Sequence, residues 1–400
     1  MLPEGWTRKR LAACAKFVSG GTPNKDTEAF WGGDFPWITA KDMKQFRLAA
    51  SGLTLTEVGK AQARAVPAGS ILVLTRGMTL LKDLPVCVTA TEAAFNQDVK
   101  ALLPVDDVDA DYLACQLIAN KHEILGLVDT AGHGTGRLDT DLLKDFEVAI
   151  APKAEQERVA KLLAVWDAAI TTTERLLANS REQGLVLAQR LMSGRTRQKG
   201  TLPWKKRKLS ELMRESRVLG SGGHEARKLT VKLYAKGVIE KSSRGAGSES
   251  TQYYRRSAGQ FIYSKLDFLN GAFGLVPAEL DGYESTLDLP AFDLLPDVDA
   301  RWLLYFVSRE EFYRSQLGLA NGGRKARRVN PKDLLQIAIP VPGIMEQQAI
   351  ADALDLAWKI ARDDEAQLRS LRIEKSALMQ QLLTGKRRVC LPAATEAVAC

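Results

Sequence analysis

The sequence predicts an α/β (α+β) fold in which two unlike α/β heads alternate with two long helices. Two observations predict it: an internal repeat at an offset of 191 residues, and an apolar period of about 3.5 residues that closes each copy. A chain of 400 residues has room for two or three domains. We therefore interpret the chain as two copies of one plan, in which a variable segment precedes a strand, a proline turn and a helix.

The repeat is clearest where each copy ends. The segments that begin at Glu155 and Glu346 align without a gap. Upstream, alternating apolar residues after Gly136 and Arg327 predict a strand in each copy. A weaker similarity, of Trp6 with Trp204 and of Leu11 with Leu209, marks where each copy begins. Identical pairs at the same offset include Gln156 with Gln347, Ala160 with Ala351, Leu163 with Leu354, Glu174 with Glu365, Leu177 with Leu368, Arg181 with Arg372, Gln189 with Gln380, Leu191 with Leu382 and Gly194 with Gly385.

Apolar residues at alternating steps of four and three predict a coiled-coil seam on each long helix. The predicted helices cover residues 153–197 and 343–388, and residues 389–400 form a tail. Gly194 and Gly385, each after a small residue, predict a left-handed cap at each helix end. On pattern alone, a plain dimerisation or spacer element stays open. The apolar seam residues are Val159, Leu163, Trp166, Ile170, Leu177, Leu187 and Leu191 in the first helix, and Ile350, Leu354, Leu368, Leu371, Leu378 and Leu382 in the second.

Composition excludes several classes of protein. Apolar residues make up 45% of the chain and charged residues 26%, as in ordinary globular domains. No apolar run is long enough for a bilayer and the N-terminus lacks the apolar core of a signal peptide, so we expect a cytoplasmic protein. Five widely spaced cysteines predict reduced thiols rather than disulfides or a zinc site. The net charge of +8 suits a polyanionic partner, but it also suits many other proteins.

Glycine turns and aromatic anchors mark the first variable segment. Residues 19–23 (SGGTP) precede residues 31–34 (WGGD) and 36–39 (PWIT), and residues 74–77 (LTRG) and 96–98 (NQD) follow. Loop geometry alone would give the same pattern, because glycine provides the backbone freedom that tight turns need.

Together with the Pro-x-x-Glu-Gln helix start at Pro152 and Glu155, these motifs resemble those of the specificity subunit of type I restriction-modification enzymes. The resemblance covers nearly the whole chain. It implies two target recognition domains, residues 1–152 and 198–342, that alternate with two helices packed antiparallel in a pseudo-twofold molecule. Such a molecule reads a bipartite DNA site, with one domain for each half-site. The second segment lacks the glycine string and has an extra residue before Glu346, so the bases it reads stay open.

The same resemblance implies the partners. These are double-stranded DNA, two modification (methyltransferase) subunits that grip the helices, and two restriction (translocase-nuclease) subunits. It implies that S-adenosylmethionine, ATP and Mg bind to those partner subunits and that this chain binds no cofactor or metal.

Candidate DNA contacts are amide, hydroxyl, aromatic and basic side chains in both heads. Arginine reads guanine and asparagine or glutamine reads adenine, whereas most other polar side chains bind phosphate. Basic clusters recur after each long helix and, from Arg324 to Arg328, before the last strand, which favours phosphate contacts, particularly in the last of these clusters. A surface loop without a ligand would have a similar composition. The candidates are Thr22, Lys41, Thr75, Arg76, Asn96, Gln97, His133, Arg137, Gln252, Tyr253, Tyr254, Arg255, Lys265, Asn270, Arg324, Lys325, Arg327 and Arg328.

The sequence predicts no catalytic residues. It contains no Walker phosphate loop, no HExxH, no GxSxG and no Pro-Pro-aromatic motif of amino-methyltransferases. Residues 132–136 (GHGTG) fall short of a dinucleotide fingerprint, and His122, His133 and His224 lack the spacing of metal ligands. A non-catalytic DNA-reading subunit accounts for most features. A DNA-acting enzyme with unrecognised chemistry and a helical scaffold that never touches DNA are the alternatives.

Overall fold

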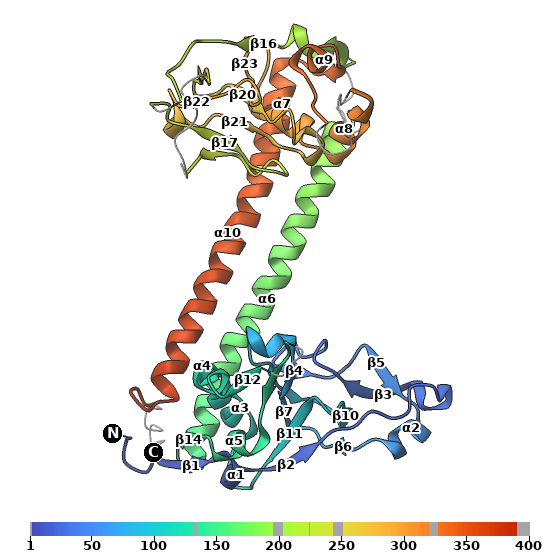
Figure 1. The fold of residues 1–400 in the computed structure, drawn as a ribbon, viewed down its shortest axis with the longest axis vertical. Coiled ribbons are helices and arrows are strands. Elements are labelled where there is room, and N and C mark those ends of the chain that lie inside the picture. Colours follow the sequence, from blue (N-terminus) through green and yellow to red (C-terminus); the bar gives the residue numbers. More distant parts are fainter. Residues whose placement is uncertain are drawn as a thin grey trace, which may run out of the picture. The chain divides into compact units, whose positions relative to one another are not determined.

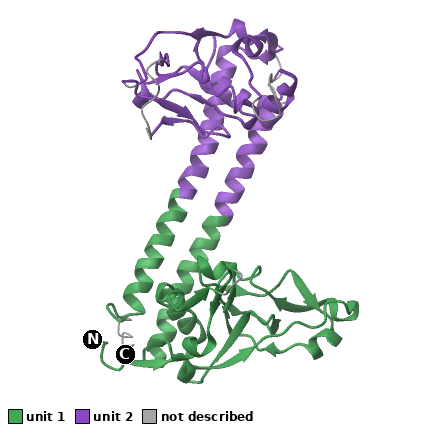
Figure 2. Ribbon diagram, in the orientation of Figure 1, with its two compact units in different colours: residues 1–174, 366–400 green, residues 175–365 purple. Residues whose placement is uncertain are grey.

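A computed structural model describes residues 2–130, 134–194, 203–223, 225–242, 251–319 and 327–389 of the chain (Figure 1). The chain divides into two compact units (Figure 2). Unit 1 comprises residues 1–174 and 366–400, and unit 2 comprises residues 175–365. Each unit therefore contains one α/β head and part of both long helices.

The head of unit 1 has short strands that gather into separate sheets. The orders are β5-β3-β10-β6, β2-β11-β7-β9-β4 and β12-β13-β8. The strands are β1 (Thr7–Arg10), β2 (Ala15–Ser19), β3 (Trp31–Ile38), β4 (Arg47–Leu48), β5 (Leu53–Leu55), β6 (Ala65–Val66), β7 (Ile71–Leu74), β8 (Arg76–Gly77), β9 (Val86–Thr89), β10 (Ala93–Phe95), β11 (Val99–Pro104), β12 (Val128–Thr130), β13 (Gly136–Leu138) and β14 (Glu147–Ile150). The helices are α1 (Leu11–Cys14), η1 (Glu28–Phe30), α2 (Glu57–Gln62), η2 (Met78–Leu81), α3 (Ala110–Ala119), α4 (Lys121–Leu125) and α5 (Thr140–Asp145).

The core of unit 1 lies around the sheet that contains β7 and β9. Every residue of both strands is buried, which explains why they read as continuous apolar runs rather than as alternation. Helix α3 packs against this sheet and is capped by Asp109, whose carboxylate accepts a hydrogen bond of 2.9 Å from the Tyr112 amide.

The head of unit 2 is built around the sheet β16-β23-β20-β21. Its core is aromatic. Stacked, tilted and edge-to-face ring pairs, with centroids 5.0 to 6.4 Å apart, join Phe261, Tyr263, Phe268, Phe273 and Phe292. The strands are β15 (Lys205–Lys208), β16 (Met213–Ser216), β17 (Leu229–Val231), β18 (Val238–Glu240), β19 (Tyr254–Arg255), β20 (Phe261–Tyr263), β21 (Phe273–Leu275), β22 (Glu284–Ser285), β23 (Ala291–Leu294) and β24 (Ala338–Val341). The helices are η3 (Leu209–Glu211), η4 (Phe268–Asn270), η5 (Ala278–Leu280), α7 (Ala300–Val307), α8 (Glu310–Ser315), η6 (Gln316–Leu319) and α9 (Pro331–Leu335).

The same two-stranded frame joins each head to the start of its long helix. In unit 1, β1 pairs antiparallel with β14, and Thr7 lies opposite Ile150. In unit 2, β15 pairs in the same way with β24, and Lys205 lies opposite Val341. The repeat predicted from sequence is therefore confirmed, including the strand before each helix.

The long helices are α6 (Lys153–Met192) and α10 (Ile344–Leu382). Gly194 has φ +64° and Gly385 has φ +72°, so the prediction of left-handed glycine caps is confirmed. Because of this cap, α10 stops well before the predicted residue 388. Helix α6 ends at Met192, and residues 195–197 of the predicted range lie outside the described residues.

The two helices run antiparallel within each unit. In unit 1 the Asp167 carboxylate lies 2.5 Å from the Lys375 ammonium, and Glu174 lies 2.6 Å from Arg372. In unit 2 the Ser180 hydroxyl donates to Asp364 over 2.6 Å, and a Cβ at Gly184 would lie 3.5 Å from the Trp358 ring. As the residue number falls along one helix, it rises along the other, which fixes the direction.

Burial follows the predicted seam on both helices. Every apolar seam residue is buried or half-buried, and Val159, Leu163, Ile350 and Leu354 also belong to the cores of the heads. The seam therefore serves two purposes: one end of each helix completes a head, and the remainder packs against the other helix.

The cysteines that the structure describes are thiols in the interior of unit 1. Cys14, Cys87 and Cys115 are free and buried, and burial raises the pKa of Cys87 and of Cys115 to about 12. No helix in the part of the chain that the structure describes is both long enough and apolar enough to cross a membrane.

Candidate nucleic-acid interface

A polar turn follows β10 in unit 1 and contains two of the predicted DNA contacts. The Thr22 hydroxyl donates to Oε1 of Gln97 over 2.7 Å, and both residues are exposed. The half-buried Asn96 donates from Nδ2 to Asp98 over 3.2 Å, whereas its buried Oδ1 has no partner in the described ranges. The structure therefore brings Thr22, Asn96 and Gln97 together, and Gln97 carries the exposed amide, a group that reads an adenine edge.

The glycine string holds this turn in place. A Cβ at Gly20 would lie 2.4 Å from the Asn96 carbonyl oxygen, so only glycine lets β2 approach the turn so closely. The Trp37 indole, on β3, donates to the Gly21 carbonyl over 3.1 Å and so fixes the segment after β2 to β3. Gly20 and Trp37 therefore help to position the polar turn.

Two predicted arginines face each other on neighbouring strands. Strand β8 pairs antiparallel with β13, and Arg76 lies directly opposite Arg137. Both side chains are exposed. Two acids lie beside Arg137: Asp139, at 3.9 Å, and Asp129, which is opposite Arg137 on β12. Like charges in direct cross-strand register destabilise a sheet unless an anion compensates them. This pair is therefore the strongest sign of an anion-binding surface in unit 1.

Lys100 adds a third cation to this surface, which the sequence did not single out. Its ammonium donates to the Ser19 hydroxyl over 2.8 Å. The pKa of Lys100 is below its usual range, mainly because the ammonium is partly buried and, to a smaller extent, because Arg76 is also positively charged. In the sequence, Lys100 could have been recognised as a candidate because it lies just after residues 96–98, at the start of β11.

Thr75 was predicted as a DNA contact, and the structure contradicts that role. Its side chain is 5% exposed, and its hydroxyl donates to the Asp98 carbonyl over 3.0 Å. Its carbonyl in turn accepts the Leu138 amide over 2.8 Å. Thr75 is a framework residue that ties β7 to the polar turn and to β13.

Lys41 projects from a turn that a carboxylate organises. Asp42 accepts hydrogen bonds from the amide and the hydroxyl of Thr39, both over 2.8 Å. Burial alone would raise the pKa of Asp42, but the hydrogen bonds from Gly52 and Thr39 hold it below its ordinary value. Lys41 itself is exposed, on a different loop from the polar turn.

In unit 2 the run 252–256 divides into surface and core. Gln252 and Arg255 are exposed, and Tyr253 and Tyr254 are half-buried. The Gln252 amide donates to the Tyr253 carbonyl over 2.7 Å, and the Lys228 ammonium lies 5.3 Å from the centre of the Tyr253 ring. These four side chains and Lys228 form a mixed aromatic and cationic surface of the kind that contacts DNA.

Arg256, next in this run, is a core residue. It is fully buried and donates to the Ser285 hydroxyl over 2.8 Å and to the Ser216 carbonyl over 3.0 Å. Burial lowers its pKa to about 10. Arg256 therefore stabilises the head, although the sequence run placed it among polar candidates.

The remaining described candidates of unit 2 lie in two places. The Lys265 carbonyl accepts the Val329 amide over 3.1 Å, so Lys265 lies beside the strand-like segment that carries the exposed Arg327 and Arg328. Arg328 lies 3.6 Å from Asp288. Asn270 lies elsewhere, in the turn that ends η4, where its side chain donates weakly to Asp267 over 3.4 Å. Three candidates, His133, Arg324 and Lys325, lie outside the described residues.

Two buried glutamines, found by the repeat but given no role from sequence, join each head to its helix. Gln156 accepts the Asp109 amide over 2.8 Å and donates to the carbonyls of Asp107 and Ala151 over 3.1 and 2.8 Å. Gln347 does the same with Asp299, Asp297 and Pro342, at 2.8, 3.1 and 3.0 Å. Their identity at the repeat offset was the available signal.

Glutamates beside these glutamines hold the tryptophans that begin each copy. The Trp6 indole donates to Glu155 over 3.2 Å, and the Trp204 indole donates to Glu346 over 3.0 Å. Arg388 also binds Glu155 with two hydrogen bonds, of 3.1 and 2.7 Å. The hydrogen bonds from Arg388 hold the pKa of Glu155 below its ordinary value.

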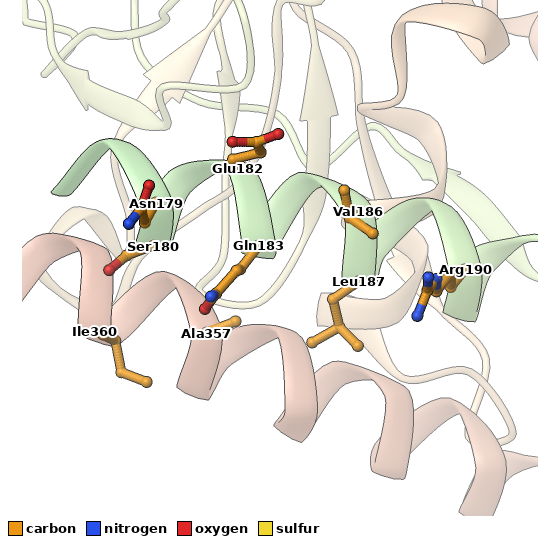
Figure 3. A pocket seen from close by; sticks show the side chains of 9 residues that line it. All are labelled: Asn179, Ser180, Glu182, Gln183, Val186, Leu187, Arg190, Ala357 and Ile360. Atoms are coloured by element: carbon orange, nitrogen blue, oxygen red, sulfur yellow. The ribbon is translucent and has the colours of Figure 1, made fainter. Parts of the chain in front are cut away.

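A groove lies on the helix pair in unit 2 (Figure 3). Its volume is about 490 Å³, and its lining consists of Asn179, Ser180, Glu182, Gln183, Val186, Leu187 and Arg190 of α6 with Ala357 and Ile360 of α10. Figure 3 shows Gln183 and Leu187 directed toward α10 and Glu182 directed away from it. Ala357 stands at the seam position that Trp166 fills in the first copy, so the second copy lacks an indole there.

No metal site accompanies these surfaces in the described part of the chain, where no group of three His, Cys, Asp or Glu side chains could hold an ion. The described polar and basic surfaces of the two heads are therefore suited to binding a polyanion rather than a metal ion.

Comparison with known proteins identifies a domain in the first half of the chain. Residues 3–179 match the family model described as "Type I restriction modification DNA specificity domain". The chain is 30% identical over 180 residues to the EcoR124I/EcoR124II specificity subunit of Escherichia coli, which covers 44% of this chain and 43% of that protein. It is 27% identical over 192 residues to the MjaIX specificity subunit of Methanocaldococcus jannaschii, covering 46% and 42%. These matches span less than half the length of the curated relatives.

Solved structures share the fold over nearly the whole chain. The S subunit of the type I restriction-modification system from M. genitalium superposes with a TM-score of 0.60 at 14% identity, covering 94% of this chain and 96% of that one. A chain from a structure of the type I R-M system gives a TM-score of 0.59 at 14% identity, covering 97% and 100%. At this identity the likeness establishes the fold alone. The domain match and the named relatives show that residues 3–179 resemble a type I restriction modification DNA specificity domain and that the chain is similar to type I specificity subunits.

Proposed function

We propose that this chain is the DNA sequence-specificity subunit of a type I restriction-modification complex and reads a bipartite target with one head for each half-site. The observation that carries the proposal is the division of the chain into two units that share one frame but present different polar surfaces. In unit 1 that surface contains the amides of Asn96 and Gln97 and the arginine pair. In unit 2 it contains Gln252 to Arg255 and Arg328.

The chain acts without catalytic residues of its own in this proposal. Support comes from the missing catalytic motifs and from the lack of a metal-holding cluster in the described ranges. S-adenosylmethionine would bind to two modification subunits, and ATP and Mg to two restriction subunits. Because the proposed ligand is cellular DNA, we expect the complex to act in the cytoplasm.

The helix pair supplies a surface for the modification subunits. Large apolar side chains are exposed along it, which is costly unless a partner covers them. The exposed fractions are 65% for Val165, 50% for Leu176, 63% for Leu185, 61% for Leu356, 50% for Ile360 and 70% for Ile373. The groove in Figure 3 lies among the residues of this set that belong to unit 2.

An exchange of one head tests the division of labour. Replacement of residues 201–340 with the corresponding segment of a relative, in the complex with its modification subunits, should change one half-site and leave the other intact. Methylation mapping of host DNA reads both half-sites directly. A simultaneous change of both half-sites would contradict the proposal of one head for each half-site.

Assays of the isolated chain test the catalytic assignment. Homogeneous protein with S-adenosylmethionine, or with ATP and Mg, should neither methylate nor cleave DNA. Turnover that persists after every trace of partner subunits is removed would favour a DNA-acting enzyme. A complex that assembles but retards no DNA would favour a helical scaffold.

A further inference from the structure

Arg137 and Arg328 occupy equivalent places in the two units. Each precedes a buried aliphatic residue whose amide donates to a residue that follows a central strand: Leu138 to Thr75 over 2.8 Å, and Val329 to Lys265 over 3.1 Å. The two arginines are separated by the repeat offset of 191. Both side chains are exposed.

The residue that follows Leu138 or Val329 begins a short helix in each unit. Asp139 is the N-cap of α5 and accepts the Asp141 amide over 2.8 Å, and Asn330 is the N-cap of α9. The contacts of the two residues that follow each arginine therefore fix its position at the start of a short framework segment. The frame repeats even though the heads have unlike cores, so the position of this arginine is a property of the shared plan.

The electrostatics of unit 1 call for an anion here. Arg137 lies in register with Arg76, and Lys100 is close enough that the charge of Arg76 helps to lower its pKa. Two carboxylates accompany Arg137 among the described residues: Asp139 at 3.9 Å, and Asp129, which lies opposite Arg137 on β12. The planar guanidinium of arginine can donate two parallel hydrogen bonds to the two free oxygens of a phosphodiester, so Arg76 and Arg137 are suited to bind a phosphate group.

The equivalent position of the two arginines favours phosphate over a base as their ligand. The two heads have different sequences and would read different bases, so a contact common to both carries no information about the sequence read. Phosphate contacts have this property, because they set register on the duplex and are blind to sequence. In unit 2 the Arg327 side chain, also exposed, adjoins Arg328, where Asp288 at 3.6 Å offsets part of the charge.

We propose that Arg137 and Arg328 are equivalent phosphate anchors, one for each half-site, and that Arg76 completes the first of them. This inference rests on the proposed function. The anchors place each head on the DNA backbone, and the neighbouring amides and aromatic side chains, which differ between the heads, read the bases.

The test uses the complex of the full chain with its modification subunits and a duplex that carries the mapped target. Arg137→Gln and Arg328→Gln should each weaken binding and reduce the slope of log affinity against log salt by about 0.9, and the double variant by about twice as much. Arg76→Gln should act in the same direction as Arg137→Gln. Methylation mapping should return the original motif for every variant.

Arg314→Gln is the matched control, because Arg314 is an exposed arginine of unit 2 that pairs with Glu310 on its own helix. Its salt slope should equal that of the wild type. An equal loss at Arg314 would show that overall charge, not an anchor, is responsible. Thermal unfolding and assembly of each variant show whether it is folded.

Two results would overturn the anchors while leaving the proposed function intact. A folded Arg137→Gln or Arg328→Gln complex with an unchanged salt slope would show that the arginine faces solvent. A changed motif in one half-site would show that the arginine reads a base. If the wild-type complex itself binds no bipartite target, the proposed function fails, and the anchors with it.

Discussion

Gln156 and Gln347 show how a single residue type can join a variable head to a repeated helix. Each side-chain amide uses both its oxygen and its nitrogen on backbone groups of the head, so it makes no demand on the head's side chains. Both residues are 1% exposed. A buried amide with its partners satisfied stabilises the joint, whereas loss of the amide leaves several backbone groups without partners.

Gln347→Leu should destabilise unit 2 by roughly 2 to 4 kcal/mol. The Asp299 amide and the carbonyls of Asp297 and Pro342 would lose their partner, and each unsatisfied buried group costs about 1 to 3 kcal/mol. Urea unfolding measures the loss. Gln348→Leu, at the exposed neighbouring position, is the control and should change stability by less than about 0.5 kcal/mol. If the two substitutions reduced stability equally, the Gln347 amide would not be what stabilises the connection between the head and the helix.

Glu155 should make the stability of unit 1 depend on pH in the acid range. Its pKa is held low in the folded state by Arg388, so its contribution is present above its ordinary pKa of about 4.3 and is lost as pH falls through the lower folded value. Denaturant unfolding between pH 3 and pH 7, for the wild type and Glu155→Gln, measures this. The difference in stability between the two should shrink toward acid pH. A difference that is constant with pH would exclude Glu155 as the source.

At the scale of elements, sequence pattern predicts what local physics determines. The helix ends at Gly194 and Gly385, the seam spacing and the strand before each helix depend on neighbours within a few residues. Which side chains meet on the candidate DNA-binding surfaces depends instead on how strands that are distant in sequence pair in the fold. No pattern places Arg76 opposite Arg137, because β8 and β13 are far apart in sequence. Likewise Thr75 is a surface candidate in the sequence, but its burial follows from the sheets that cover it.

Two glycines of the long helices should respond in opposite ways to alanine. Gly184→Ala should stabilise unit 2 by about 1 kcal/mol, since alanine favours helix and its Cβ would meet Trp358 at an ordinary 3.5 Å. Gly385→Ala should destabilise unit 1 by at least about 1 kcal/mol, because φ is +72° and a Cβ would lie 2.4 Å from Pro3. Thermal and urea unfolding compare the pair. Destabilisation by Gly184→Ala would show that the helix is strained at that point.

At the scale of the whole molecule, α6 carries the chain from unit 1 into unit 2 and α10 returns it, so helix length should set the spacer between half-sites. One heptad inserted near Ser180, and another near Leu371, adds roughly 10 Å and keeps the seam in register. The preferred spacer should lengthen by about three base pairs. Methylation mapping of the heptad variant measures the spacer.

Insertion of five residues at the same two positions is the control for that experiment. It adds a similar length but rotates the seam out of register, so this variant should lose stability or assembly. A heptad variant that folds and still modifies only the original spacer would exclude helix length as the ruler.

The ion pairs of the helices have an evolutionary consequence. Glu174 binds Arg372 in unit 1 at 2.6 Å, and Glu365 binds Arg181 in unit 2 at 3.1 Å, so each repeat gives its glutamate to the other repeat's arginine. A contact in which residue i meets j and j meets i is isologous, which is the signature of a twofold homodimer. Within one chain, the two repeats therefore make the reciprocal ion pairs that two copies of a homodimer would make, which is the arrangement that duplication of a one-headed chain would leave.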